Sequence, residues 1–166
     1  MAEKNELHVT PAIRALRAAG VVFTHHNYAY EEKGGTAVSA RELGEDEHHI
    51  LKTLVLEDDR KQPLLCLMHG DREVSLRGLA RVIGARSVAM CSADAATKHT
   101  GYLFGGTSPF GTRKPLPVYA HTGIEALERV LINGGKRGFL VALPTRELVR
   151  VLGPIFADVA APAVTG

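Results

Sequence analysis

The chain has 166 residues, 45% of them apolar, and a formal net charge of +2, which fits one globular domain with its own core. Its only cysteines, Cys66 and Cys91, exclude a disulfide-stapled scaffold, and their spacing matches no paired zinc motif. The sequence contains neither an apolar leader segment nor a run of about 20 apolar residues, so we expect a cytoplasmic protein without a membrane partner.

Helix and strand signals alternate in short segments along the chain. In chain order we expect helices at 11–19, 37–43, 76–83, 93–100 and 146–152, strands at 21–30, 49–56, 63–69, 87–91, 118–121 and 139–143, a helical turn or strand at 124–132, and a glycine turn at 133–138. The expected N-caps are Thr10, Thr36, Ser92 and Thr145.

The order of these elements indicates the fold class. The polar segment 57–62 between two apolar strands predicts a hairpin, and the short helices do not follow a regular βαβ rhythm. We therefore expect a single α+β domain with a curved mixed β-sheet or barrel and short surrounding helices, preceded by a flexible arm at residues 1–9.

Charge is distributed unevenly along the chain. Residues 31–59 carry nine acidic and three basic side chains, so the remainder is strongly basic. A basic remainder attracts a polyanion at long range, but scattered, solvated Lys and Arg side chains explain it equally well.

Lys52 lies inside the apolar run 50–56 and is the most informative single residue. In a strand it shares a face with Ile50, Leu54 and Leu56. Lysine is rarely buried without a partner, so the Lys52 side chain should reach a carboxylate, a cavity or an anionic ligand. A snorkelling lysine or a simple ion pair is the structural alternative.

The second candidate site is the glycine-dense segment 101–111. Backbone N–H groups in such a loop are able to hold an anion or an oxyanion, and a tight structural connection is the alternative. The segment is neither a Walker loop nor a dinucleotide fingerprint.

No metal, cofactor or activated protein nucleophile is expected. The adjacent histidine pairs at 25–26 and 48–49 point to opposite faces of any strand that contains them, so neither pair supplies two ligands to one site. No serine has a nucleophile-elbow context, and neither cysteine has an identifiable activating partner.

Several segments together resemble one protein family. They are Thr10-Pro11-Ala12-Ile13, Lys52-Thr53-Leu54, Gly101-Tyr102, Gly105-Gly106-Thr107-Ser108-Pro109-Phe110-Gly111 and Gly134-Gly135-Lys136-Arg137-Gly138. Each motif is weak alone, but in this order and spacing they resemble the YbaK/EbsC family, most closely its Cys-tRNA(Pro) deacylase branch. The resemblance implies a free-standing editing domain over residues 10–160, similar to the editing insertion of bacterial prolyl-tRNA synthetases.

The resemblance also implies an activity. Such proteins remove cysteine that has been attached by mistake to proline tRNA, and they associate with prolyl-tRNA synthetase. The ester is thought to be cleaved by the thiol of the substrate itself, in a hydrolase or lyase type of reaction. This route agrees with the lack of a protein nucleophile.

Residue roles follow from the same resemblance. Lys52 and Gly101 match the residues at the catalytic centre, with Lys52 expected to contact the terminal adenosine or its phosphate. The residues expected to bind the substrate are Tyr28, Thr53, Tyr102, Gly106, Ser108, Gly134 and Gly135, and those expected to contact tRNA phosphates are Arg113, Lys114, Lys136 and Arg137. Asn133 departs from the small residue that relatives often carry there, and Glu31-Glu32 makes the expected mouth of the pocket acidic.

The alternatives are a deacylase for another small aminoacyl-tRNA, carrying alanine or serine, a non-catalytic module that binds tRNA or the synthetase, and a binder of small thiols or phosphates. The sequence does not give the pocket volume that would separate the two deacylases.

Overall fold

The computed structural model describes residues 5–162. Its helices are α1 (Pro11–Ala18), α2 (Gly35–Leu43), α3 (Leu76–Ile83), α4 (Ala93–Thr100) and α5 (Thr145–Leu152), with 3₁₀ turns η1 (Glu47–His49) and η2 (Thr122–Ala126). Its strands are β1 (Thr24–Asn27), β2 (Ile50–Asp58), β3 (Pro63–His69), β4 (Val88–Met90), β5 (Val118–His121), β6 (Arg129–Lys136), β7 (Phe139–Pro144) and β8 (Ile155–Ala157).

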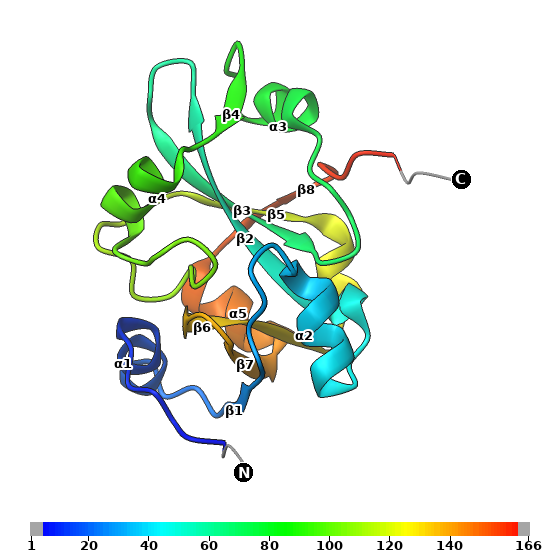
Figure 1. Ribbon diagram of the computed structural model, residues 1–166. Coiled ribbons are helices and arrows are strands. Elements are labelled where there is room, and N and C mark those ends of the chain that lie inside the picture. The colour runs from blue at the N-terminus through cyan, green and yellow to red at the C-terminus, as the bar shows by residue number, and fades with distance from the viewer. Residues whose placement is uncertain (1–4, 163–166) are drawn as a thin grey trace.

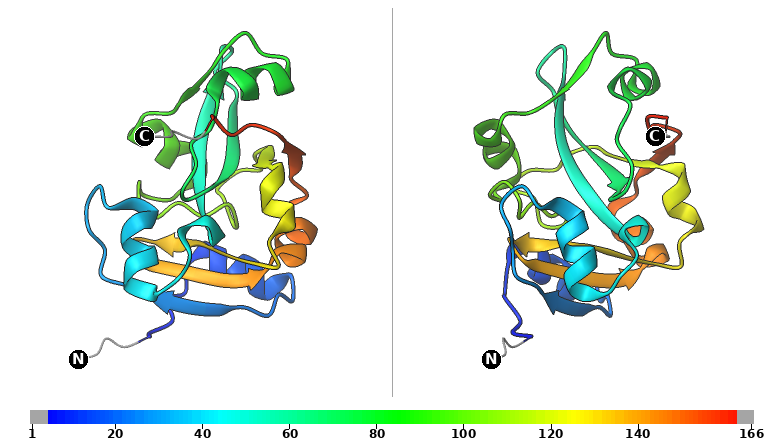
Figure 2. Two further views of the ribbon diagram at one scale, coloured as in Figure 1. Left: turned by 90° about the vertical axis from the view of Figure 1, so that its right-hand side faces the viewer. Right: turned by 45° about the vertical axis from the view of Figure 1, so that its right-hand side comes forward.

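One mixed sheet organises the molecule, as the sequence predicts for an α+β domain. The strand order is β1-β7-β6-β2-β3-β5-β8, with β4 paired to the far end of β2. The predicted hairpin is confirmed as the antiparallel pair β2–β3, and β2 also pairs in parallel with β6. The long β2–β3 hairpin rises from the layer of β1, β7 and β6, with α2 in front of it (Figures 1 and 2).

The core lies on both faces of β2. Leu51 and Val55 point into the main cluster with α1 and β7, whereas Leu56 packs with Cys66 and Met68 beneath α3. Strand alternation produces this division, because successive side chains point to opposite faces. No helix in residues 5–162 is long and apolar enough to cross a membrane.

Two of the four predicted N-caps are confirmed. The hydroxyl of Thr10 accepts a hydrogen bond from Ile13 N, and that of Ser92 accepts one from Ala95 N. Pro11 occupies the first helical position, where its missing N–H is not needed.

The predicted N-caps at Thr36 and Thr145 are wrong, because the N-cap positions are occupied by Gly34 and Pro144. Helix α2 already begins at Gly35, and the Thr36 hydroxyl instead donates to Glu47 Oε2 at 2.7 Å, which ties α2 to η1. Thr145 is the first residue of α5, and the preceding residue, Pro144, occupies the N-cap position. The backbone N–H of Thr145 donates to Glu128 O at 3.0 Å.

Two predicted segment boundaries are also wrong. The strand predicted at 21–30 is limited to β1, because only Thr24–Asn27 pair with β7. Gly134 and Gly135 belong to β6 rather than to a turn, since the register shifts between Asn133 and Lys136 and forms a bulge. The side chain of Asn133 closes the bulge, with Oδ1 accepting from Gly135 N at 2.6 Å.

The segment before α1 is hydrogen-bonded to β1. Asn5 O lies 2.9 Å from His25 Nε2, and Asn27 donates to Glu6 O at 3.0 Å. Residues 1–4 of the arm predicted at residues 1–9 lie outside the described residues.

The glycine bulge generates a stability prediction. Gly135 has φ +103°, and a Cβ there would lie 2.9 Å from the Tyr102 ring. We expect Gly135→Ala to lower the free energy of unfolding by roughly 2–4 kcal/mol, measured by urea denaturation.

Gly84→Ala is the matched control for this substitution. Gly84 also has a positive φ, +75°, but a Cβ there meets nothing within 4 Å. Gly84→Ala should therefore lower the free energy of unfolding by only about 1 kcal/mol, the cost of placing alanine in the left-handed backbone conformation. Equal losses in the two variants would show that contact with Tyr102 contributes nothing.

Candidate active site

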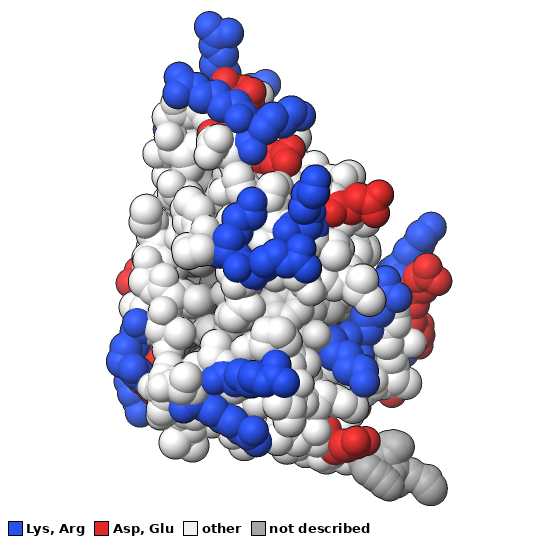
Figure 3. Space-filling view, turned by 90° about the vertical axis from the view of Figure 1, so that its left-hand side faces the viewer, with Lys and Arg blue, Asp and Glu red and all other residues white. Residues whose placement is uncertain are grey.

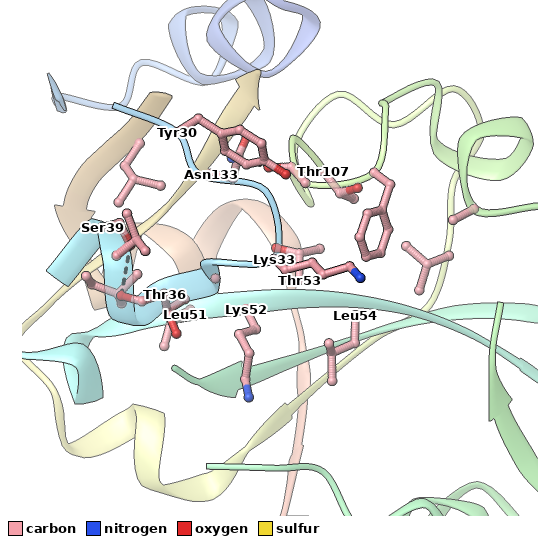
Figure 4. Close-up of a pocket in the computed structure, with 18 of the residues that line it drawn as sticks. Tyr30, Lys33, Thr36, Ser39, Leu51, Lys52, Thr53, Leu54, Thr107 and Asn133 are labelled. Carbon is pink, nitrogen blue, oxygen red and sulfur yellow. Dashed lines mark hydrogen bonds between the residues drawn. The ribbon is translucent and has the colours of Figure 1, made fainter. Parts of the chain in front are cut away.

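A cavity of about 320 Å³ opens between β2, α2 and the loop that contains the glycine-dense segment. One wall is formed by β2, with Leu51, Thr53 and Val55. Above it lie Tyr30 from the loop after β1 and Thr107 from the glycine loop (Figure 4). The cavity therefore combines an apolar floor with polar groups from several segments, as small-molecule sites commonly do.

Thr53 is the predicted substrate-binding residue that best fits the cavity. Its side chain points from β2 toward Tyr30 and Thr107 (Figure 4). Its Oγ1 is buried and has no hydrogen-bond partner among the described residues. A buried hydroxyl without a partner lowers the stability of the fold. A ligand could hydrogen-bond to this oxygen without breaking any hydrogen bond within the protein.

Lys52 lies beside Thr53 on β2 and lines the edge of the cavity, but its ammonium points to the other side of the strand (Figure 4). There Nζ donates to Arg72 O and to Glu73 Oε2, which lies at 3.2 Å. This partner agrees with the expectation that a lysine in an apolar strand needs a carboxylate. Glu73 is 84% exposed, so the ion pair is weak and open to exchange.

Lys33 is the cation that extends across the cavity on the side of Thr53 (Figure 4). Its backbone has φ +63°, a conformation uncommon outside glycine. Strained residues concentrate at ligand sites. The sequence pattern did not single out Lys33, because a lysine between two glutamates and two glycines reads as an ordinary exposed loop residue.

Close backbone contacts hold the rim of the cavity. Arg137 Nε donates to Phe104 O at 2.8 Å, and its guanidinium lies 5.4 Å from the centre of the Tyr30 ring. Asn133 Nδ2 donates to Gly105 O at 3.3 Å. These contacts fix the loop over β2, and Asn133 itself lines the cavity.

Comparisons with known proteins identify the family of this site. Residues 31–151 match the family model of the aminoacyl-tRNA editing domain, which covers the loop after β1, β2 and the glycine loop. The chain belongs to this family. It is therefore an aminoacyl-tRNA deacylase of the editing type, as the motifs of its sequence indicate.

One curated relative matches this chain over nearly its whole length, and another matches it over a short stretch of a longer protein. The chain is 29% identical over 160 residues to a protein of Enterococcus faecalis named "Putative Cys-tRNA(Pro)/Cys-tRNA(Cys) deacylase EbsC", covering 96% of this chain and 98% of that one. It is also 33% identical over 84 residues to the proline--tRNA ligase of Thermodesulfovibrio yellowstonii, covering 51% of this chain but 14% of the ligase.

The fold is shared with solved structures. A crystal structure titled as a putative trans-editing enzyme for prolyl tRNA synthetase superposes with a TM-score of 0.82 at 22% identity, covering 93% of this chain and all of that one. The editing-domain fold, with its mixed sheet and short helices, is thus confirmed.

Within this editing domain, four predicted residues of the glycine loop lie outside the cavity lining. Gly101 ends α4 with φ +84° and is exposed. The buried Tyr102 donates its hydroxyl to Phe110 O at 2.5 Å. Ser108 is also buried, and its Oγ accepts from Phe110 N. Gly106 lets the loop approach Arg137 N, where a Cβ would lie at 2.9 Å. These contacts shape the loop, and the predicted contacts of the four residues with the substrate stay predictions.

Gly134 and Gly135 also lie behind the cavity wall. A Cβ at Gly134 would lie 2.7 Å from the Phe139 ring, and its carbonyl accepts from Thr10 Oγ1 at 2.5 Å. Of the predicted substrate-binding residues, the cavity contains Tyr28 and Thr53.

The four predicted phosphate contacts are all exposed: Arg113, Lys114, Lys136 and Arg137. Arg113 stands next to Gly101, and Lys136 approaches His8 with Nζ 3.4 Å from Nδ1. Lys and Arg side chains predominate on the face of the molecule that Figure 3 shows. This face is suited to an anionic partner at long range.

No hydroxyl or thiol that lines the cavity is hydrogen-bonded to a histidine among residues 5–162. Ser39 donates to Thr36 O at 3.1 Å. Burial, and next the Glu57 carboxylate, raises the pKa of the Cys91 thiol to about 11. The cavity therefore offers no activated nucleophile, because a thiol with that pKa is protonated at neutral pH.

The protonation state of the Cys91 thiol can be tested by alkylation. The rate of iodoacetamide labelling follows the thiolate, so it should rise roughly tenfold for each pH unit from 7 to 10. Cys91→Ser, which retains the buried Cys66, supplies the background. A plateau near pH 9 would show an unperturbed thiol instead.

Proposed function

We propose that this deacylase removes cysteine from Cys-tRNA(Pro), with the thiol of the substrate as the nucleophile. The observation that carries the proposal is an editing-domain cavity in which no lining hydroxyl or thiol is hydrogen-bonded to a histidine among residues 5–162. The names of the E. faecalis relative and of the trans-editing structure support the choice of amino acid and tRNA.

The reaction needs no group from the protein that forms a covalent bond. The cysteine sulfur bonds to the carbonyl carbon of its own ester, and the bond from that carbon to the ribose oxygen breaks. The thiol proton ends on the ribose oxygen, and cysteine leaves as a cyclic thiolactone. An enzyme accelerates such a step by holding sulfur and carbon together and by stabilising the oxyanion.

The described side chains divide this work between the two sides of β2. The Thr53 hydroxyl and the Lys33 ammonium face the cavity, so we assign them to the aminoacyl ester and its developing negative charge. Lys52 lies on the other side, so we assign it to a phosphate of the terminal nucleotide, which would replace the exposed Glu73. Gly101 remains a proposed backbone contact at the end of α4.

Specificity follows from the same chemistry. Alanine has no side-chain nucleophile, and a serine hydroxyl is far less acidic than a thiol, so both esters should persist. Proline tRNA and association with prolyl-tRNA synthetase are further parts of the proposal. The match to a stretch of a proline--tRNA ligase supports both.

The decisive experiment is deacylation of labelled Cys-tRNA(Pro), Ala-tRNA(Pro), Ser-tRNA(Pro) and Pro-tRNA(Pro) by the whole protein. We expect cysteine to be released more than about 100-fold faster than the other three. Lys52→Ala should lower kcat/KM for the cysteine ester by roughly 100-fold, and Lys33→Ala by roughly tenfold. Arg146→Ala, which removes an exposed cation on α5, is the control.

Each other outcome supports a different reading. Faster release of alanine or serine would keep the deacylase but replace the substrate. Near-normal turnover by Lys52→Ala together with loss of activity in Lys33→Ala would show that the essential cation is Lys33, on the cavity side of β2. Salt-sensitive tRNA binding without cleavage of any ester would indicate a binding module, and stabilisation by a small thiol or phosphate in the absence of tRNA would indicate a small-molecule binder.

Thr53 gives a separate prediction. Thr53→Val keeps the side-chain shape but removes the unpaired hydroxyl, so the free energy of unfolding should stay the same or rise by about 1 kcal/mol. If the hydroxyl contacts the substrate, kcat/KM should fall about tenfold. Thr53→Ser restores the hydroxyl and should recover most of the activity. A more stable Thr53→Val variant with unchanged kcat/KM would show that the Thr53 hydroxyl does not contact the substrate.

A further inference from the structure

Three side chains with metal-ligand chemistry meet beside the cavity, which one of them, Cys91, also lines. Glu57 lies near the end of β2, Cys91 directly follows β4, and His99 lies in the last turn of α4. Their ligand atoms all lie within 4.8 Å of one another. The sequence spacing predicts no such site, because the three residues come from separate segments that only the pairing of β4 with β2 brings together.

These groups are enclosed rather than spread over the surface. The side chains of His99 and Glu57 are 13% and 21% exposed, and His99 Nε2 lies 3.3 Å from Glu57 Oε2. Cys91 lines the cavity. A thiol, an imidazole and a carboxylate, each half-buried and at such short distances, form a cluster unlike a chance group of solvated acids.

The polar atoms of the cluster do not all have strong hydrogen-bond or ion-pair partners within the protein. His99 Nδ1 is buried without a hydrogen-bond partner among the described residues. The one Lys or Arg ion-paired with Glu57 in residues 5–162 is Lys61, at 3.9 Å, and Lys61 is 85% exposed. Such a contact is worth little. The negative charge of Glu57 is thus available to a cation that binds closer.

We propose that Glu57, Cys91 and His99 form a binding site for a zinc-class divalent metal ion. Thiolate, imidazole and carboxylate are the three ligand types that zinc takes in proteins, whereas calcium and magnesium require oxygen ligands. Three protein ligands leave a fourth position for water.

Binding requires only modest changes in the cluster. Tetrahedral zinc with bonds of about 2.0–2.3 Å holds its ligand atoms about 3.5 Å apart. The present separations, all within 4.8 Å, therefore need to contract by at most about 1.3 Å. The thiol of Cys91 has to lose its proton to solvent as the metal binds, which is usual for zinc thiolates. The bound ion would join β2, the end of β4 and α4 at the cavity wall.

The test is metal titration of the whole protein after chelation and dialysis, without tRNA. Zinc should bind with one-to-one stoichiometry by calorimetry and raise Tm. Cobalt should give the intense absorption of a thiolate-to-cobalt charge transfer. Cys91→Ser, His99→Gln and Glu57→Gln should each weaken zinc binding by roughly tenfold or more, and only Cys91→Ser should abolish the cobalt band.

Two controls make the result decisive. Cys91→Ser retains the buried Cys66, so loss of the band assigns the sulfur ligand to Cys91. His26→Gln removes a histidine of β1 outside the cluster and should bind zinc like the unchanged protein. Binding that survives Cys91→Ser, or weak binding at several sites, would overturn the proposal. Since no aminoacyl-tRNA is used, either result is independent of the deacylase substrate.

Discussion

Backbone contact that only glycine permits determines how the cavity is assembled. A Cβ at Gly111 would lie 2.5 Å from Pro11 O at the start of α1, and a Cβ at Gly106 would lie 2.9 Å from Arg137 N beyond β6. Together with the contact of Gly135 with the Tyr102 ring, these approaches join the first helix, the glycine loop and the β6 bulge. The loop residues that reach the cavity are Phe104, Gly105 and Thr107, and Gly106 and Gly111 beside them make the close backbone contacts. The glycines of the motif thus determine the position of the loop that borders the cavity.

The alternation of β2 then separates two kinds of chemistry. Thr53 faces the cavity with an unpaired hydroxyl, and Lys52 faces Glu73 on the opposite side. A hydroxyl buried without a partner costs stability, and selection for folding alone would favour valine in its place. The unpaired oxygen is consistent with the proposed contact between Thr53 and the aminoacyl ester, which would supply its missing hydrogen-bond partner.

Local signals in the sequence predicted what depends on neighbouring residues. The caps at Thr10 and Ser92, the β2–β3 hairpin and the face of Lys52 are all set by a few adjacent positions, and the structure confirms them. Thr36 was assigned wrongly because its hydroxyl bonds to Glu47, eleven positions away. For the same reason the cavity positions of Lys33 and Cys91 were not predicted, since both depend on how β1, β4 and the glycine loop fold onto β2.

The acidic segment 31–59 repels a polyanion such as tRNA, and ion pairs offset part of its charge. Glu31 pairs with Arg41 at 2.8 Å, and Glu45 pairs with Arg129 at 3.3 Å. These acids are compensated by bases close to them, so much of their repulsion is cancelled within a Debye length of about 10 Å. The cations of 113–114 and 136–137 are exposed, and no ion pair with a carboxylate is found for them among residues 5–162. Pairing the acids with neighbouring bases allows a nearly neutral chain to present a basic face to its polyanionic substrate.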